Sequence, residues 1–184
     1  MKIAISGSAG TGKTTLAEVL SERMGVQCIP EGVREYLVSR GVVDFRNMTP
    51  ADTMEMQSHL LDQKIKLENV HTDFVADRST ADNLAYCLRW CARDIQDSIL
   101  SEYMVRCEQH ISVYDLIVFC PWGAIPYKRD NLRSRHLYYQ YEMDRLIFGI
   151  LAQWTSQYYV LKSIDLEDRV LELQNVISRY RTYA

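Results

Sequence analysis

Gly7-Ser8-Ala9-Gly10-Thr11-Gly12-Lys13-Thr14-Thr15 is the stretch that decides the fold of this 184-residue chain. It fits the pattern Gly-x-x-x-x-Gly-Lys-Ser/Thr, in which a glycine-rich loop binds phosphate through its backbone amides. Its flanks agree with that interpretation, because the apolar run Ile3–Ile5 precedes it and a helical run follows at Leu16–Leu20. The pattern predicts a strand, a phosphate-binding loop and a helix that begins near Lys13.

Each part of the loop has a chemical task. Gly7 and Gly12 allow backbone angles that a Cβ would forbid, so that several N–H groups can converge on one anion. Lys13 supplies a cation for the β and γ phosphates, and the Thr14 hydroxyl can ligate Mg²⁺. We therefore expect ATP and Mg²⁺ as cofactors, with the nucleotide bound by Gly7, Ser8, Ala9, Gly10, Thr11, Gly12, Lys13, Thr14 and Thr15.

Apolar runs of strand length alternate with helical patterns along the whole chain. The runs are Ile3–Ile5, Val26–Ile29, Asp73–Ala76, Leu116–Cys120 and Tyr158–Leu161. One helix is predicted to begin at Thr49-Pro50, with Asp52 three residues after the cap, and another after Asp165. This alternation predicts an α/β fold of the P-loop NTPase type, a parallel sheet flanked by helices, in a single domain over residues 1–184.

Composition narrows the function. Lys and Arg number 21 against 24 Asp and Glu, so the net charge of −3 argues against a dedicated duplex-DNA or anionic-membrane binder. No apolar run approaches the roughly 20 residues that span a bilayer. The five cysteines (Cys28, Cys87, Cys91, Cys107 and Cys120) form no Cys-x-x-Cys pair, so we expect reduced, buried thiols in a cytoplasmic protein.

Ligands of open parallel sheets gather where the strands end, and two predicted strands end in charged residues. Glu31 and Arg34 follow the second strand, and Asp77 and Arg78 follow the third. A carboxylate there can accept the proton of an acceptor hydroxyl, and an arginine can neutralise the charge of a transferring phosphoryl group. We expect Lys13, Glu31, Asp77 and Arg78 in catalysis, Asp77 beside the metal, and Glu31, Arg34 and Arg78 at the substrate. The sequence leaves open whether Glu31 or Asp77 is the general base.

The stretch after the fourth strand predicts a lid. Residues 121–135 are rich in Pro, Gly and Asn and carry four basic residues against one acid. Small kinases close such a lid over the phosphates to exclude water and to bring cations to the spreading charge. We expect a basic lid over about residues 121–135, with Arg133 as a catalytic residue and Arg129 at the substrate.

Two other classes of P-loop protein fit poorly. A GTPase needs Asn-Lys-x-Asp after a late strand, whereas Leu161-Lys162-Ser163-Ile164-Asp165 lacks the Asn and places the Asp one position too far along. A motor ATPase normally ends a long apolar strand in Asp-Glu, whereas here Asp77 is followed by Arg78. A small kinase remains.

These motifs resemble those of the AAA_28 P-loop family, which includes the kinase domain of NadR-type ribosylnicotinamide kinases. The resemblance is carried by Pro30-Glu31-x-x-Arg34-Glu35, by Asp77-Arg78-Ser79 with Asp82 and Ala85-Tyr86, and by Pro126 with Asp130-Asn131-Leu132-Arg133. The chain is similar, more distantly, to deoxynucleoside and thymidylate kinases. The resemblance implies a five-stranded parallel sheet with the first strand central, Mg-ATP as donor, and a small hydroxyl-bearing acceptor near Glu31 and Asp77.

Three hypotheses about the function follow, two of which differ in the phosphoryl acceptor. The favoured one is a nucleoside, a nucleotide or a nicotinamide-riboside-like molecule, whose base could stack on Tyr36, Tyr86, Trp90 or Trp122. A hydroxymethylated base in DNA is possible but not favoured, since the basic lid is its only support. A non-catalytic, ATP-dependent switch is the third, and the sequence leaves self-association open.

Lys13→Ala tests the premise that these hypotheses share. It should weaken the binding of ATP while the fold stays intact, because we expect the Lys13 ammonium to contact the phosphates. Titration calorimetry with Mg-ATP, beside circular dichroism of the same sample, checks both halves. Unchanged affinity would count against a phosphate-binding loop here.

Overall fold

The computed structural model describes residues 1–43, 47–126 and 137–183. Within them, five parallel strands form one sheet in the order β2-β3-β1-β4-β5. The strands are β1 (Lys2–Ser6), β2 (Gln27–Ile29), β3 (Phe74–Asp77), β4 (Leu116–Phe119) and β5 (Tyr158–Val160). The predicted strands are confirmed with each bound shifted by at most one residue, and so is the central place of the first strand.

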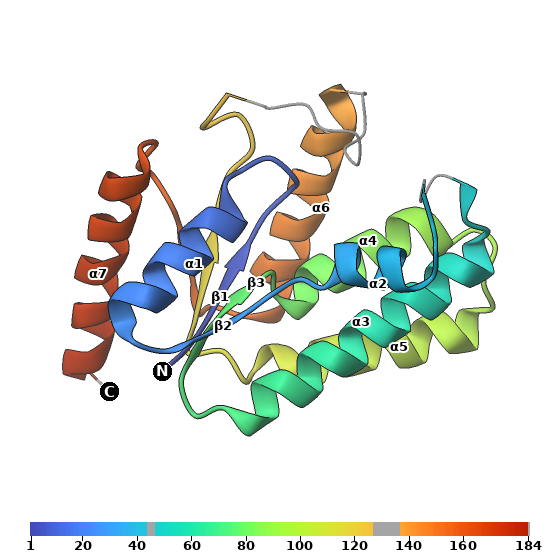
Figure 1. Cartoon of the computed structure of the whole chain (residues 1–184), viewed down its shortest axis with the longest axis horizontal. Helices are drawn as coiled ribbons and strands as arrows, with labels where there is room; N and C mark the ends of the chain where they lie inside the picture. The colour runs from blue at the N-terminus through green and yellow to red at the C-terminus, as the bar shows by residue number, and fades with distance from the viewer. Residues whose placement is uncertain (44–46, 127–136, 184) are drawn as a thin grey trace.

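Helices cover both faces of the sheet, as predicted (Figure 1). They are α1 (Lys13–Met24), α2 (Val33–Ser39), α3 (Pro50–Val70), α4 (Thr80–Cys91), α5 (Asp97–Ile111), α6 (Leu137–Trp154) and α7 (Leu166–Tyr183). α1 and α7 pack on one face, whereas α3, α4, α5 and α6 pack on the other.

The alternation of side chains along β1 explains the two layers. Ile3 and Ile5 are fully buried against α1 and α7, and Ala4 between them is fully buried on the opposite side. Successive side chains of a strand point to opposite faces, so a strand buried on both faces reads as a continuous apolar run. This burial fixes β1 at the centre of the sheet and thereby fixes the loop that follows it.

Two helices begin with reciprocal caps that the sequence specifies. At α3 the Thr49 side chain accepts from the Asp52 N–H, and the Asp52 carboxylate accepts from the Thr49 N–H. Ser79 and Asp82 form the same reciprocal capping hydrogen bonds at the start of α4. Such caps satisfy amides that have no partner within the helix. The first confirms the helix predicted at Thr49, and the second places α4 directly after β3.

The cysteines are free thiols, as expected. Cys87, Cys91, Cys107 and Cys120 are buried, and Cys28 is half-buried. Burial raises the pKa of Cys107 and of Cys120 to about 12, so both stay protonated and unreactive at neutral pH. Among the described residues, no helix has the length and apolar character needed to traverse a membrane.

A buried charged cluster ties α3 to α5 away from the phosphate loop. Glu68 is fully buried, 3.0 Å from the Lys64 ammonium and 2.6 Å from Nε2 of His110. Tyr114 donates its hydroxyl to the same carboxylate. Burial alone would raise the pKa of Glu68, but the charges of Lys64 and His110 hold it below its usual value. The ionised carboxylate is therefore part of the folded core.

Glu68→Gln should lower the free energy of unfolding at pH 7 by about 3 kcal/mol, because it leaves the Lys64 ammonium buried without its counter-charge. The folded-state pKa lies below the unfolded value of about 4.3, so this contribution is present above that pH. It is lost as the pH falls through the folded-state pKa. The difference between wild type and variant should thus be present above about pH 5 and shrink below about pH 4.

Urea unfolding across that pH range measures the difference. Glu55→Gln is the matched control, since Glu55 lies on the same helix and pairs with Arg40 at the surface. It should change stability by at most about 1 kcal/mol. Equal losses for the two variants would contradict the role of burial.

Candidate active site

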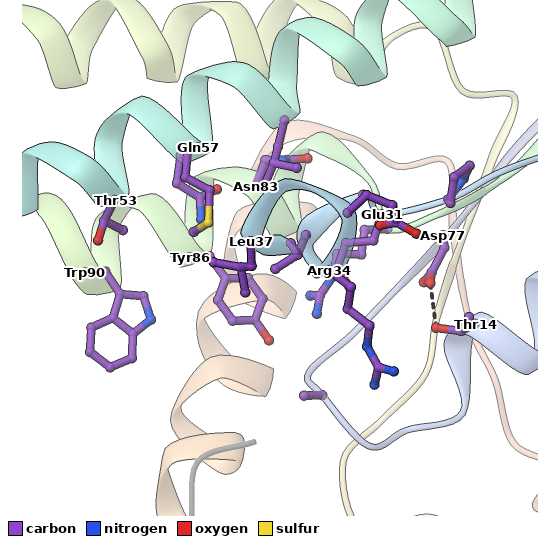
Figure 2. A pocket seen from close by; sticks show the side chains of 18 of the residues that line it. Thr14, Glu31, Arg34, Leu37, Thr53, Gln57, Asp77, Asn83, Tyr86 and Trp90 are labelled. Carbon is purple, nitrogen blue, oxygen red and sulfur yellow. Dashed lines mark hydrogen bonds and ion pairs between the residues drawn. The ribbon is translucent and has the colours of Figure 1, made fainter. Parts of the chain in front are cut away.

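One cavity of about 580 Å³ lies beside the phosphate loop at the ends of β2 and β3. Its walls come from the loop, the segment after β2, and helices α2, α3, α4 and α6. In Figure 2 the labelled side chains run from Thr14 and Asp77 at one end to Trp90 at the other. Candidate residues from separate stretches of the sequence therefore line one cavity: Ala9, Gly10, Lys13, Thr14, Glu31, Arg34, Asp77 and Arg78.

The backbone of the loop approaches the sheet more closely than any side chain would allow. Gly7 has a φ of 139°, and a Cβ there would lie 2.5 Å from the carbonyl oxygen of Cys120. Its N–H donates to Asp82 at 3.1 Å. Gly10 and Gly12 also have positive φ, at 85° and 79°. The glycines thus give the loop the left-handed turns that bring its amides together around an anion.

The Lys13 side chain lies against the backbone of the phosphate loop. Its side chain is buried, and its ammonium donates to the carbonyl oxygen of Ser8 at 2.7 Å. Burial lowers the pKa of Lys13, with the positive charge of Arg78 acting in the same direction. A nearby anion would offset that cost, because it stabilises the charged form. The lysine therefore favours the binding of a polyphosphate.

Thr14 and Asp77 meet as the sequence predicts for a metal site. The Thr14 hydroxyl donates to Oδ2 of Asp77 at 2.6 Å, and Figure 2 shows the two side chains joined. Oδ1 of Asp77 is buried and has no hydrogen-bond partner among the described residues. A hydroxyl beside an unpaired carboxylate oxygen suits Mg²⁺, because this ion takes few protein ligands and completes its coordination shell with phosphate and water. Within the described chain no cluster of three or more acidic, His or Cys side chains offers a rival site.

Arg78 is held in a strained conformation. Its φ of 75° is the one positive value among the non-glycine residues that the structure describes. Its guanidinium forms an ion pair with Glu31, lies 3.5 Å from Asp82, and stacks 4.5 Å from the ring centre of Tyr86. A left-handed residue costs about 1–2 kcal/mol, and such strain gathers at functional sites. The strain places a fixed cation between Glu31 and the wall of the cavity.

The far end of the cavity contains two amide side chains that sequence reasoning missed. Gln57 of α3 and Asn83 of α4 line it beside Tyr86 and Trp90, two of the rings proposed for stacking. Gln57 is nevertheless visible in the sequence as a polar residue among buried apolar positions of α3, such as Met54 and Leu61. A buried polar side chain at a core position signals a packing or binding partner.

Other predicted positions lie elsewhere. Tyr36 is buried 5.1 Å from the His59 ring, and Trp122 packs edge-on to Tyr141; neither lines the cavity. Of the predicted lid, residues 121–126 are described and carry no regular helix or strand. Arg129 and Arg133 lie outside the described residues, so their roles stay predictions.

The sequence matches the AAA_28 family, described as an AAA domain, over residues 2–169. The chain belongs to this family. The match covers the phosphate loop, every strand of the sheet and all the helices that line the cavity.

Similar proteins include kinases of nucleotides and nucleosides. A cytidylate kinase from Methanothermobacter thermautotrophicus (strain ATCC 29096 / DSM 1053 / JCM 10044 / NBRC 100330 / Delta H) is 29% identical over 117 residues, 61% of this chain and 68% of that enzyme. A deoxyadenosine kinase from M. mycoides has a similar structure, with a TM-score of 0.71, 17% identity, and coverage of 97% and 100% of the two chains. NadR protein, in complex with NAD and AMP-PNP, gives a TM-score of 0.70 at 18% identity.

The alignment with NadR protein covers 97% of this chain but 48% of that one. The predicted fold, a P-loop domain of the nucleoside-kinase type, is confirmed, as is the resemblance to the NadR and deoxynucleoside kinase group. The cytidylate kinase relative also confirms the predicted class of enzyme, a P-loop phosphotransferase.

Gly7→Ala should disrupt the loop, because the new Cβ would collide with a backbone oxygen that cannot move aside without shifting β4. We expect a loss of at least about 2 kcal/mol of stability and of most ATP affinity. Gly25→Ala is the control: Gly25 also has positive φ, but open space surrounds it. That variant should lose about 1 kcal/mol and bind ATP normally. Thermal unfolding and calorimetry distinguish them, and equal binding by both variants would contradict the close approach at Gly7.

Proposed function

We propose that this protein is an ATP-dependent kinase that transfers the γ-phosphoryl group to a hydroxyl group of a nucleoside-like small molecule. The observation that carries the proposal is the shared cavity, in which Glu31 and Asp77 lie beside Lys13 and Thr14. A phosphate donor and a hydroxyl acceptor can meet there without either leaving the site. Holding two reactants in line is the main task of a phosphoryl-transfer enzyme.

The donor end is built for a triphosphate. The loop amides and the Lys13 ammonium would hold the β and γ phosphates, and the positive end of α1 adds to their attraction. Thr14 and Asp77 would hold Mg²⁺, which when bound neutralises the charge of the β and γ oxygens. Arg34 lines the same cavity and adds a further cation on the acceptor side.

At the acceptor end Glu31 is the better candidate for the general base. Its side chain is one-third exposed, at 33%, and the ion pair with Arg78 fixes its direction. Asp77, by contrast, already accepts from Thr14 and is almost fully buried. Glu31 would accept the proton of the acceptor hydroxyl. At the same time the hydroxyl oxygen would bond to the γ phosphorus, and the bond between that phosphorus and ADP would break.

The charges around Arg78 favour a hydroxyl over a phosphate as the accepting group. Its guanidinium is matched by the carboxylates of Glu31 and Asp82. An acceptor phosphate placed there would face Glu31 and would have to displace it from the arginine. A neutral hydroxyl, in contrast, gains a hydrogen-bond acceptor in Glu31 at no electrostatic cost.

The far wall suits a flat heterocycle. Tyr86 and Trp90 offer aromatic faces, whereas Gln57 and Asn83 offer amide groups that both donate and accept hydrogen bonds. Rings and paired amides are what a nucleobase needs for stacking and for recognition of its polar edge. Similarity to kinases of nucleotides and nucleosides supports an acceptor that carries a nucleobase.

The test is a panel of nucleosides, their monophosphates, nicotinamide riboside and hydroxymethylated DNA, each incubated with Mg-ATP. We expect ADP and a phosphorylated product with at least one nucleoside-type compound, and little with the monophosphates. Glu31→Gln should lower kcat by about 10²-fold or more with KM for ATP unchanged. Glu22→Gln, an exposed position of α1, should leave both unchanged.

Two results would overturn the proposal. Transfer to DNA with none to free nucleosides would assign a different acceptor. Binding of ATP without transfer to any compound, together with full biological effect of an Asp77→Asn variant, would assign a switch.

A further inference from the structure

α6 places a buried glutamine in the cavity. Gln140 lies in the first turn of that helix, is 2% exposed, and lines the same space as Glu31 and Asp77. The sequence patterns did not select it, because it belongs to no motif. Its neighbours determine which chemical group it can offer.

The backbone of the phosphate loop fixes the orientation of the Gln140 carboxamide. The N–H of Ala9 donates to Oε1 of Gln140 at 3.0 Å. A backbone N–H can only donate, so the atom that receives it must be the carboxamide oxygen. The Nε2 group then remains, and it can only donate. Because Gln140 lines the cavity, the polar group that its carboxamide has left for a ligand there is the Nε2 donor.

The helix that carries Gln140 is firmly placed. Met143 and Ile147 on the same helix are fully buried in the core. One turn after Gln140, Asp144 is almost fully buried and accepts from the backbone N–H of Trp122 at 2.7 Å. α6 is thus bonded both to the phosphate loop and to the segment after β4. A donor on such a helix is positioned before any ligand arrives.

The position of Ala9 indicates which part of the ligand Gln140 meets. Ala9 and Gly10 line the cavity together with Lys13 and Thr14, whereas the other loop residues do not. Ala9 thus lies on the side of the loop that faces Glu31 and Asp77, where the phosphoryl group passes from donor to acceptor. The oxygens of that group are acceptors only, and they match a side chain that can only donate.

We propose that Gln140 is a further residue of the phosphoryl-transfer site, which donates from Nε2 to an oxygen of the γ-phosphoryl group. This inference rests on the proposed kinase function. During transfer the bond from phosphorus to the acceptor oxygen forms and the bond to ADP breaks, while negative charge spreads over the three equatorial oxygens. Gln140 moves no proton. It lowers the energy of that charge with a fixed dipole.

Gln140→Glu separates this role from simple support of the loop. A glutamate can still accept from the Ala9 N–H, but it cannot donate and it adds a negative charge. Gln140→Leu loses both bonds. Gln153→Glu is the matched control, since Gln153 is an exposed glutamine near the other end of α6.

Binding of AMP-PNP and of ADP is measured for each variant by calorimetry, with the thermal midpoint as a check on folding. We expect Gln140→Glu to stay folded with a lower midpoint, because it buries a charge, and to lose about 10- to 100-fold in affinity for AMP-PNP but less in affinity for ADP, because only AMP-PNP carries the γ group. With an acceptor found, kcat should fall by about 10²-fold. Gln153→Glu should match wild type.

The outcomes are distinct. Equal effects of Gln140→Glu on ADP and AMP-PNP, or no effect on either, would overturn the role in γ-phosphoryl contact and leave Gln140 as support for Ala9. If Gln140→Leu fails to fold, Gln140→Glu still decides the question. Wild-type protein that binds neither nucleotide would overturn the proposed kinase itself.

Discussion

The buried ammonium of Lys13 is the constraint on which the site depends. It is bonded to a neutral carbonyl oxygen, that of Ser8, at 2.7 Å, and its burial lowers its pKa. A buried charge is costly unless an opposite charge compensates it. The carboxylates of Asp77, Asp82 and Glu31 offset part of this cost, and a polyphosphate in the loop would offset more of it. The fold itself therefore favours the binding of a polyphosphate donor, because the strand before the loop and the helix after it hold the lysine in place.

Asp82 links that loop to the rest of the site. This fully buried carboxylate accepts from the N–H of Gly7, caps α4 through Ser79, and lies 3.5 Å from the guanidinium of Arg78. One side chain thus positions the start of the phosphate loop, the start of a helix and the cation that directs Glu31. The donor and acceptor ends cannot shift independently, because they share this carboxylate. The capping residue of a helix is here also a residue that shapes the active site.

The sequence was sufficient for the parts of the molecule that local patterns control. The strands were predictable because strands buried on both faces are continuous apolar runs, and Thr49 marked the start of α3 through its cap. Glu31 and Asp77 were found because parallel strands end at one edge of the sheet.

Contacts between distant elements were not predictable in the same way. Gln140 meets Ala9 across 131 positions of the chain, and no periodicity records such a pair. Tyr36 and Trp122 were proposed for stacking on the strength of their position after a strand, but side-chain direction depends on the local turn. The structure packs them against His59 and Tyr141 instead. Helix periodicity likewise gives the face of α3 that is buried, but it does not say that Gln57 on that face borders a cavity rather than the core.

This difference follows from how the two ends of the site are built. The donor end is one continuous segment, residues 7–15, whose chemistry is carried mainly by backbone atoms and can be recognised by spacing alone. The acceptor end is assembled from side chains of α2, α3, α4 and α6, each placed by the packing of its own helix. Asp82 of α4 and Gln140 of α6 also bond to the loop, so the two ends are physically linked, although only the donor end can be recognised from sequence spacing. The donor can therefore be inferred from the sequence of the loop alone. The acceptor has to be inferred from where the structure places Gln57, Asn83 and Trp90.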